Sequence, residues 1–172
     1  EITMITELFL ESFKRIVSAE RKIAGAKGDI NTLREAKKLG FSDRYIASAW
    51  GVKETEVYKM RREADIVPVF RMVDTLHTGK YIAYLYSSYS GKNDSRLSDK
   101  KKIVVLGAGP IRIGQGVEFD YSTVHAVQTI RRAGYEAIII NNNPETVSTD
   151  YTTADKLYFE PLTPEDVMAV ID

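Results

Sequence analysis

The chain has 172 residues, with 24 Lys or Arg and 24 Asp or Glu, so its formal charge is zero. A balanced charge gives no reason to expect binding to nucleic acid or to membranes. The lack of cysteine excludes a disulfide scaffold, a thiolate metal site and a cysteine nucleophile. No apolar run approaches the roughly 20 residues that cross a bilayer, and the first residues carry no signal-peptide pattern. We therefore expect a cytoplasmic protein and, because the chain begins with Glu1 and ends inside an expected helix, a piece of a longer one.

The first half of the chain is predicted to be helical. Apolar residues recur at spacings of three and four from Ile5 to Ala24, which is typical of a helix of about five turns with one apolar stripe. Asn31 or Thr32 is expected to cap a second helix. Pro68 prevents the last helix from continuing. The shorter helices are expected at 31–39, 42–50 and 52–64, and the Tyr-rich residues 80–87 are expected to be extended.

A tract of small and polar residues at 87–95 is typical of a linker. Basic residues outnumber acidic ones before this tract, and acidic residues outnumber basic ones after it. We therefore expect a helical domain over residues 1–95, with its C-terminal linker at about 87–99, and a second domain over residues 100–172.

The second half of the chain is predicted to alternate strands and helices. Residues 102–106 and 136–140 are short apolar runs rich in β-branched residues, as expected of strands buried on both faces, and 157–159 is a third strand. One helix is expected from Phe119 or Ser122 to Ala133, and another starts at Thr163, where Pro follows the capping Thr. This alternation predicts right-handed crossovers and an open parallel sheet, so the fold class is α + α/β.

A glycine-rich segment follows the first expected strand and precedes its helix. Glycines let the backbone approach a ligand, and free N–H groups near a helix N-terminus attract anions. A dinucleotide fingerprint needs glycine at position 112 and an acid after the second strand, and the sequence has Arg112 and asparagines there, so we exclude NAD binding. The spacing leaves a phosphate or carboxylate loop and a purely structural loop equally open. The candidate residues are Gly107, Gly109, Arg112, Gly114, Gln115 and Gly116.

A polar segment from Asn141 to Asp150 follows the second expected strand of the sheet. Loops at the carboxyl ends of parallel strands form the usual ligand crevice. Turn and capping chemistry explains the same residue types, and the sequence alone slightly favours it. We expect this turn and the glycine-rich turn to meet as one wall of a cleft. The candidate residues are Asn143, Glu145, Thr146 and Thr149.

Residues 42–62 match the pattern of a DNA-binding helix-turn-helix. Glu54 and Glu56 at the exposed start of the second helix would face phosphates, which is unfavourable. Any two short crossed helices need the same packing, so a DNA-binding module and a purely structural assembly element both remain alternatives. No catalytic residue and no metal ligand is singled out, since His77 and His125 have no partner at ligand spacing.

Long strings in both halves closely resemble the large chain of carbamoyl phosphate synthase. They are VVLGAGPIRIGQGVEFDY at 104–121, GYEA at 134–137, NNNPETVSTDY at 141–151 and DKLYFEPLT at 155–163. The large chain is an internal duplication, and the forms PIRIGQG and PETVSTD resemble its second half. The first half of this chain resembles the helical oligomerisation domain that precedes it, including residues 41–43, 51–52 and 68–74. The resemblance covers essentially the whole chain and implies a Rossmann-like pre-ATP-grasp domain that is incomplete here.

The resemblance implies a parent ligase that makes carbamoyl phosphate from bicarbonate, ammonia and two ATP, for arginine and pyrimidine biosynthesis. A glutaminase small subunit delivers the ammonia, and the second half phosphorylates carbamate that arrives through an internal tunnel. ATP, its Mg or Mn and the main catalytic residues belong to ATP-grasp domains outside this sequence. We therefore expect the fragment to have no cofactor, to be inactive, to self-associate in the parent, and to bind neither nucleic acid nor membrane.

The resemblance also implies a role for the two turns. A pre-ATP-grasp domain closes one side of the substrate crevice, where it would position a small anion and exclude water from carbamate. Backbone N–H groups between Gly107 and Gly116 would favour the anion, and Arg112 would either add charge or pair with an acid. The loop at 143–150 is expected to line the same crevice.

Overall fold

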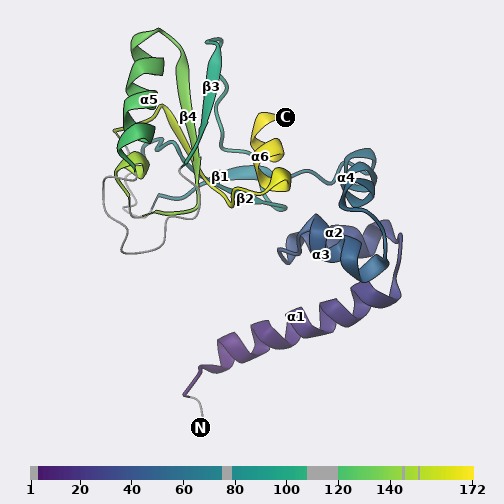
Figure 1. The fold of residues 1–172 in the computed structure, drawn as a ribbon. Coiled ribbons are helices and arrows are strands. Elements are labelled where there is room, and N and C mark those ends of the chain that lie inside the picture. The colour runs from purple at the N-terminus through teal and green to yellow at the C-terminus, as the bar shows by residue number, and fades with distance from the viewer. Residues whose placement is uncertain (1–3, 75–78, 108–119, 145, 151) are drawn as a thin grey trace. The chain divides into compact units, whose positions relative to one another are not determined.

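The computed structural model describes residues 4–74, 79–107, 120–144, 146–150 and 152–172 (Figure 1). Two compact units, Glu1–Val67 and Pro68–Asp172, make up the chain, and each is described by itself. Within the described residues, none of the helices combines the length and the apolar character that crossing a bilayer requires.

The first unit is a small bundle of helices. The elements are α1 (Glu7–Gly25), α2 (Ile30–Lys38), α3 (Asp43–Trp50) and α4 (Glu54–Glu63). Its core is apolar and includes the buried side chains of Ile23, Leu33, Ile46, Trp50 and Val57.

Short polar side chains and a glycine set the ends of these helices. The Asp29 side chain accepts from the backbone N–H of Thr32 at 2.7 Å, so Asp29 caps α2 in place of the expected Asn31 or Thr32. The helix begins at Ile30, which puts both expected caps inside its first turn. Ser42 caps α3, and Gly51 ends it with a φ of 63°, a left-handed conformation that suits glycine.

A buried group of charges ties three of the helices together. The Asp43 carboxylate lies 2.6 Å from Arg61 Nε and 3.1 Å from Lys37 Nζ, and the three side chains are almost fully buried. Such a group holds its members in one arrangement, because removing one of them leaves the other charges buried without compensation.

The second unit is an open five-stranded sheet with the strand order β1-β2-β5-β4-β3. Only β1 and β2 pair antiparallel, and the other three pairings are parallel. The strands are β1 (Val69–Met72), β2 (Tyr84–Ser88), β3 (Lys102–Leu106), β4 (Glu136–Asn141) and β5 (Lys156–Phe159). The remaining elements are α5 (Tyr121–Arg132), the 3₁₀ turn η2 (Val147–Thr149) and α6 (Pro164–Ile171). The predicted fold class, a helical part followed by an open, mostly parallel sheet, is confirmed.

Helices cover both faces of the sheet (Figure 1). Ile138 and Ile140 of β4 pack toward the side that contains Val167 of α6, whereas Ala137 and Ile139 pack toward Val127 of α5. This alternation is the period of two expected of a strand. All six residues of β4 are buried, because helices pack on both faces of the sheet and β4 lies between two other strands.

The boundary between the units lies near residue 68 and not near residue 95. Residues 69–72 and 84–88 form β1 and β2, which belong to the sheet of the second unit. The expected linker is not a spacer either, because Asn93 and Asp94 hydrogen-bond to the backbone of β1. Backbone pairing with strands that come later in the chain therefore places residues 68–95 with the sheet.

The strand β3 was expected to be buried on both faces, but it lies at an edge of the sheet. Its burial is partial, with Ile103 38% and Leu106 52% exposed. An apolar β-branched run of five residues indicates a strand, but it does not indicate how many neighbours that strand has.

Candidate functional site

The candidate site lies where β3 and β4 end. These strands are parallel, with Leu106 opposite Ile140, so the segments that follow them start at the same edge of the sheet. The backbone N–H of Gly107 donates to the carbonyl of Ile140 at 2.8 Å. A Cβ atom on Gly107 would lie 2.6 Å from Cγ of Asn141, so this close approach of the two turns requires glycine.

The Asn141 side chain organises the second turn from the end of β4. It is 1% exposed, its Oδ1 accepts from the backbone N–H of Asn143 at 3.0 Å, and its Nδ2 donates to Oγ of Ser148 at 3.4 Å. Asn and Asp commonly bond the backbone two residues further on, which closes a tight turn. Asn141 therefore holds both ends of the polar loop.

Asp120 connects the end of the glycine-rich segment to the same loop. It precedes α5 and is fully buried. One carboxylate oxygen, Oδ2, accepts from Oγ1 of Thr146 at 2.8 Å and from the backbone N–H of Ser148. The described ends of the two turns are thus joined twice, through Gly107 with Asn141 and through Asp120 with the loop.

The structure describes four of the ten candidate residues. Asn143 and Thr146 are half-buried in the loop, and Gly107 lies at the junction of the turns. Thr149 is buried, and its hydroxyl donates to the carbonyl of Thr146 at 2.8 Å, so it shapes the loop from within. The others, Gly109, Arg112, Gly114, Gln115, Gly116 and Glu145, lie outside the described residues.

Three residues that anchor the site, Asp120, Asn141 and Ser148, are not among the candidate residues predicted from the sequence. Each is almost fully buried and polar, and the hydrogen bonds of these three side chains join segments far apart in sequence. Buried polar groups need such partners, so an Asp at the end of a glycine-rich loop was the available indication. Its position before a helix had a simpler explanation, because acids are favourable at helix N-termini in any case.

The carboxyl end of β5 carries a further buried acid, Glu160. Its carboxylate accepts from the backbone N–H of Ser87 and from the Ser87 hydroxyl, the latter at 2.8 Å. Burial raises the pKa of Glu160, which the two bonds from Ser87 offset in part and the charge of Asp166 reinforces. Glu160 thus ties β5 to its neighbour β2, on the side of β5 that faces away from β4.

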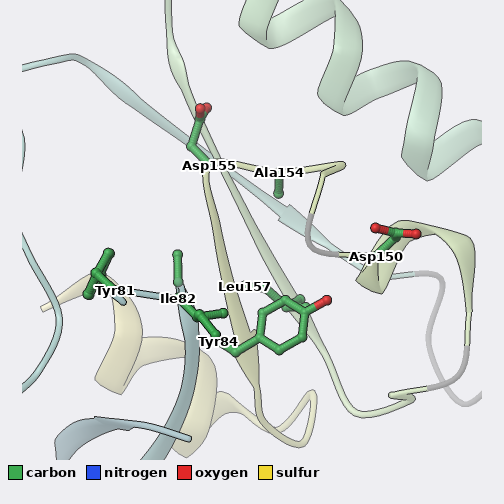
Figure 2. Close-up of a pocket in the computed structure, with 8 residues that line it drawn as sticks. Tyr81, Ile82, Tyr84, Asp150, Ala154, Asp155 and Leu157 are labelled. Atoms are coloured by element: carbon green, nitrogen blue, oxygen red, sulfur yellow. The ribbon is translucent and has the colours of Figure 1, made fainter. Parts of the chain in front are cut away.

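A shallow pocket of about 160 Å³ lies at the opposite, amino ends of β2 and β5 (Figure 2). Tyr81, Tyr84, Asp150 and Asp155 line it together with small and aliphatic residues. Asp155 Oδ2 accepts from the backbone N–H of Ala137 at 2.8 Å. Among the described residues there is no group of three or more His, Asp or Glu side chains able to hold a metal ion.

Residues 42–62, which match the helix-turn-helix pattern, form α3 and α4, but one basic side chain of α4 is buried. Arg61 of α4 is 1% exposed and paired with Asp43, so it is not available to a phosphate. Glu54 and Glu56 occupy the first turn of α4, where they favour the helix dipole and oppose a nucleic-acid backbone.

These observations define a class of protein: a helical unit followed by an open α/β unit with a polar loop at the carboxyl end of a parallel strand, the edge at which such sheets bind ligands. Two family models identify the family. Residues 1–65 match the oligomerisation domain of the carbamoyl-phosphate synthetase large chain, and residues 99–172 match the carbamoyl phosphate synthase preATP-grasp domain. The chain belongs to the carbamoyl phosphate synthase large-chain family, and the resemblance in its sequence is confirmed.

Proposed function

We propose that this chain supplies two parts of a glutamine-dependent carbamoyl phosphate synthase. The helical unit would contribute to the assembly of the enzyme, and the sheet unit would form one wall of the crevice in which carbamate is phosphorylated. The parent reaction would consume bicarbonate, ammonia released from glutamine by a small subunit, and two ATP.

One observation carries the proposal for the sheet unit: Gly107 and Asp120, the described ends of the glycine-rich segment, are both held against the polar loop that follows β4. The side-chain hydrogen bonds of Asp120 and Asn141 both go to the loop after β4, and Ser148 of that loop bonds both residues. Side chains that are locked in this way can hold a wall in place without moving during the reaction.

The chemistry of carbamate explains why a wall is useful. Carbamate and carboxyphosphate decompose in water, so the crevice has to be closed around them. The strings PIRIGQG and PETVSTD resemble the second half of the large chain, and this supports carbamate as the substrate rather than bicarbonate. ATP and its Mg or Mn would be held by the ATP-grasp domains, so this chain alone is expected to be inactive.

The parent enzyme that carries this chain tests the proposal through its two partial reactions. Gly107→Ala would push a Cβ into Asn141 and displace the turn that Asn141 holds. We expect ATP formation from ADP and carbamoyl phosphate, the reverse of carbamate phosphorylation, to fall by about tenfold or more. Bicarbonate-dependent ATP hydrolysis should change little.

Gly25→Ala is the matched control, because a Cβ there meets nothing within 4 Å and Gly25 has no positive φ. This control should leave both partial reactions unchanged. Equal loss of both reactions in Gly107→Ala would contradict the assignment to the carbamate step, as would no loss of either.

A further inference from the structure

A segment that neither family match covers contributes to the sheet unit. The match to the oligomerisation domain ends at residue 65, and the match to the preATP-grasp domain begins at residue 99. The residues between them form β1 and β2, and β2 pairs parallel with β5. This connecting segment therefore adds its own side chains to the sheet, and one of them bonds the polar loop that follows β4.

That side chain is Tyr84, the first residue of β2. Its hydroxyl donates to the backbone carbonyl of Thr149 at 2.7 Å, across 65 positions of the sequence. Figure 2 shows the ring directed toward the segment that carries Asp150. Thr149 is only 3% exposed, so the hydroxyl provides a partner for a backbone carbonyl that has little access to water.

Aromatic packing fixes the direction of the Tyr84 ring. Phe159 of β5 meets this ring edge to face, with ring centroids 5.3 Å apart and an interplanar angle of 85°. Tyr86 stacks on the same phenylalanine, with ring centroids 4.9 Å apart. Edge-to-face pairs of this kind are favourable, so the hydroxyl reaches Thr149 from a ring that is itself held in place.

Three hydrogen bonds join Thr149 to Thr146, one of the residues expected to line the crevice. The Thr149 hydroxyl and the Thr149 backbone N–H donate to the Thr146 carbonyl at 2.8 Å and 3.1 Å. The Thr146 backbone N–H donates to the Thr149 hydroxyl oxygen at 3.3 Å. Asp120 accepts from the Thr146 hydroxyl, so the loop is held by Asp120 at one point and by Tyr84 at another.

We infer that Tyr84 is a positioning residue for the carbamate step: its hydroxyl keeps Thr149, and through Thr149 also Thr146, in the place that the crevice wall requires. The inference rests on the proposed function and adds to it a residue from outside both family matches. Tyr84 stands at the amino end of β2, so its effect on the reaction is indirect. A displacement of about 1 Å in a positioned group can lower a rate by about 100-fold, so the loss of one anchor should be measurable.

The substitution Tyr84→Phe in the parent enzyme tests this role, because it removes the hydroxyl and keeps the ring. We expect the kcat of ATP formation from ADP and carbamoyl phosphate to fall by about fivefold to tenfold. The KM for ADP should stay unchanged, since the ATP-grasp domains would hold ADP, and bicarbonate-dependent ATP hydrolysis should also stay unchanged. Tyr86→Phe is the matched control, because Tyr86 lies on the same strand, contacts the same Phe159 and is 38% exposed. It should leave both partial reactions unchanged.

Hydrogen exchange of the 172-residue chain tests the restraint on the loop independently of activity. The backbone N–H groups of Thr149 and Asp150 donate to carbonyls within the loop, so their exchange reports whether this part of the loop opens. In Tyr84→Phe both should exchange about fivefold faster or more, while the exchange of β4 stays unchanged. Tyr86→Phe should alter neither region.

Unchanged exchange at Thr149 and Asp150, or an unchanged carbamate step, in Tyr84→Phe would overturn the inference. Equal loss of both partial reactions would also overturn it, because it would indicate a general structural role of the hydroxyl. A failure of the proposed function is distinguishable, since it appears in Gly107→Ala as an unimpaired carbamate step, whatever the result with Tyr84→Phe.

Discussion

Asp120 offers the sharpest test of the site, because a single carboxylate oxygen connects the two turns. Replacing Asp120 with Ala removes the acceptor of the Thr146 hydroxyl and of the Ser148 backbone N–H. Both donors are then left without a partner at a position that is fully buried in the native unit. The expected result is a selective loss of stability in the Pro68–Asp172 unit.

The magnitude follows from the chemistry of the two bonds. A hydrogen bond to a charged group contributes about 1.5–3 kcal/mol, so two bonds give about 3–6 kcal/mol. Among the described residues the other oxygen, Oδ1, has no partner, so removing the carboxylate also relieves some desolvation cost. We therefore expect a loss of about 3 kcal/mol for Asp120→Ala. The loss for Asp120→Asn should be about 1 kcal/mol, since the amide oxygen can still accept both bonds.

Urea unfolding measures this loss separately in the two units. Trp50 belongs to the helical unit, so its fluorescence reports that unit, while tyrosine signals and circular dichroism include the sheet unit. With a slope of about 1–3 kcal/mol per molar urea, the loss of about 3 kcal/mol should lower the midpoint of the sheet transition by about 1–3 M in Asp120→Ala. The Trp50 transition should stay in place. The control is Asp150→Asn on the same loop, an exposed acid whose Oδ1 accepts from the backbone N–H and the hydroxyl of Thr152.

Two outcomes would refute the reasoning. An unchanged sheet transition would show that the carboxylate does not hold the turns together. An equal shift of both transitions would show that the substitution acts on the whole chain and not on the site.

Three further predictions concern charge and backbone conformation. Folding raises the pKa of Glu160, so its contribution to stability is fully present below the ordinary carboxyl pKa and is lost as pH rises through the raised pKa. In Glu160→Gln the urea midpoint of the sheet unit should therefore fall less steeply as pH rises. Gly51→Ala should destabilise the helical unit by about 1–2 kcal/mol in Trp50-monitored unfolding, because L-residues are strained at its φ of 63°. Asp43→Ala should cost about 3–5 kcal/mol in the same assay, since Lys37 and Arg61 stay buried without their counter-ion.

The sequence predicted the elements well where local chemistry decides them. Ser42 and Thr163 cap their helices as expected, and the apolar runs near 102 and 136 are neighbouring parallel strands. Capping and the period of two act within a few residues, so the sequence is sufficient to predict them.

Prediction failed where the partner is distant in sequence. The extended conformation expected at 80–87 is present as β2, but these residues and 69–72 were assigned to the helical domain. They belong to the sheet, because β2 pairs with β1 and with β5, which lies about 70 residues later in the chain. The polar tract at 93–95 then serves β1 through Asn93 and Asp94. Small polar residues are suited to both roles, so composition alone could not distinguish a linker from a strand partner.

The site shows the same division between local and distant effects. The sequence predicted that the segments after residues 106 and 140 would share an edge, because parallel strands place their carboxyl ends together. It did not predict which side chains join them, since Asp120 reaches Ser148 across 28 positions. That contact determines how a loss of activity after a substitution at the site is interpreted. A change at Thr146 or Ser148 acts on the turn through Asp120, so a loss of activity there indicates a displaced wall until direct contact of the side chain with substrate is measured.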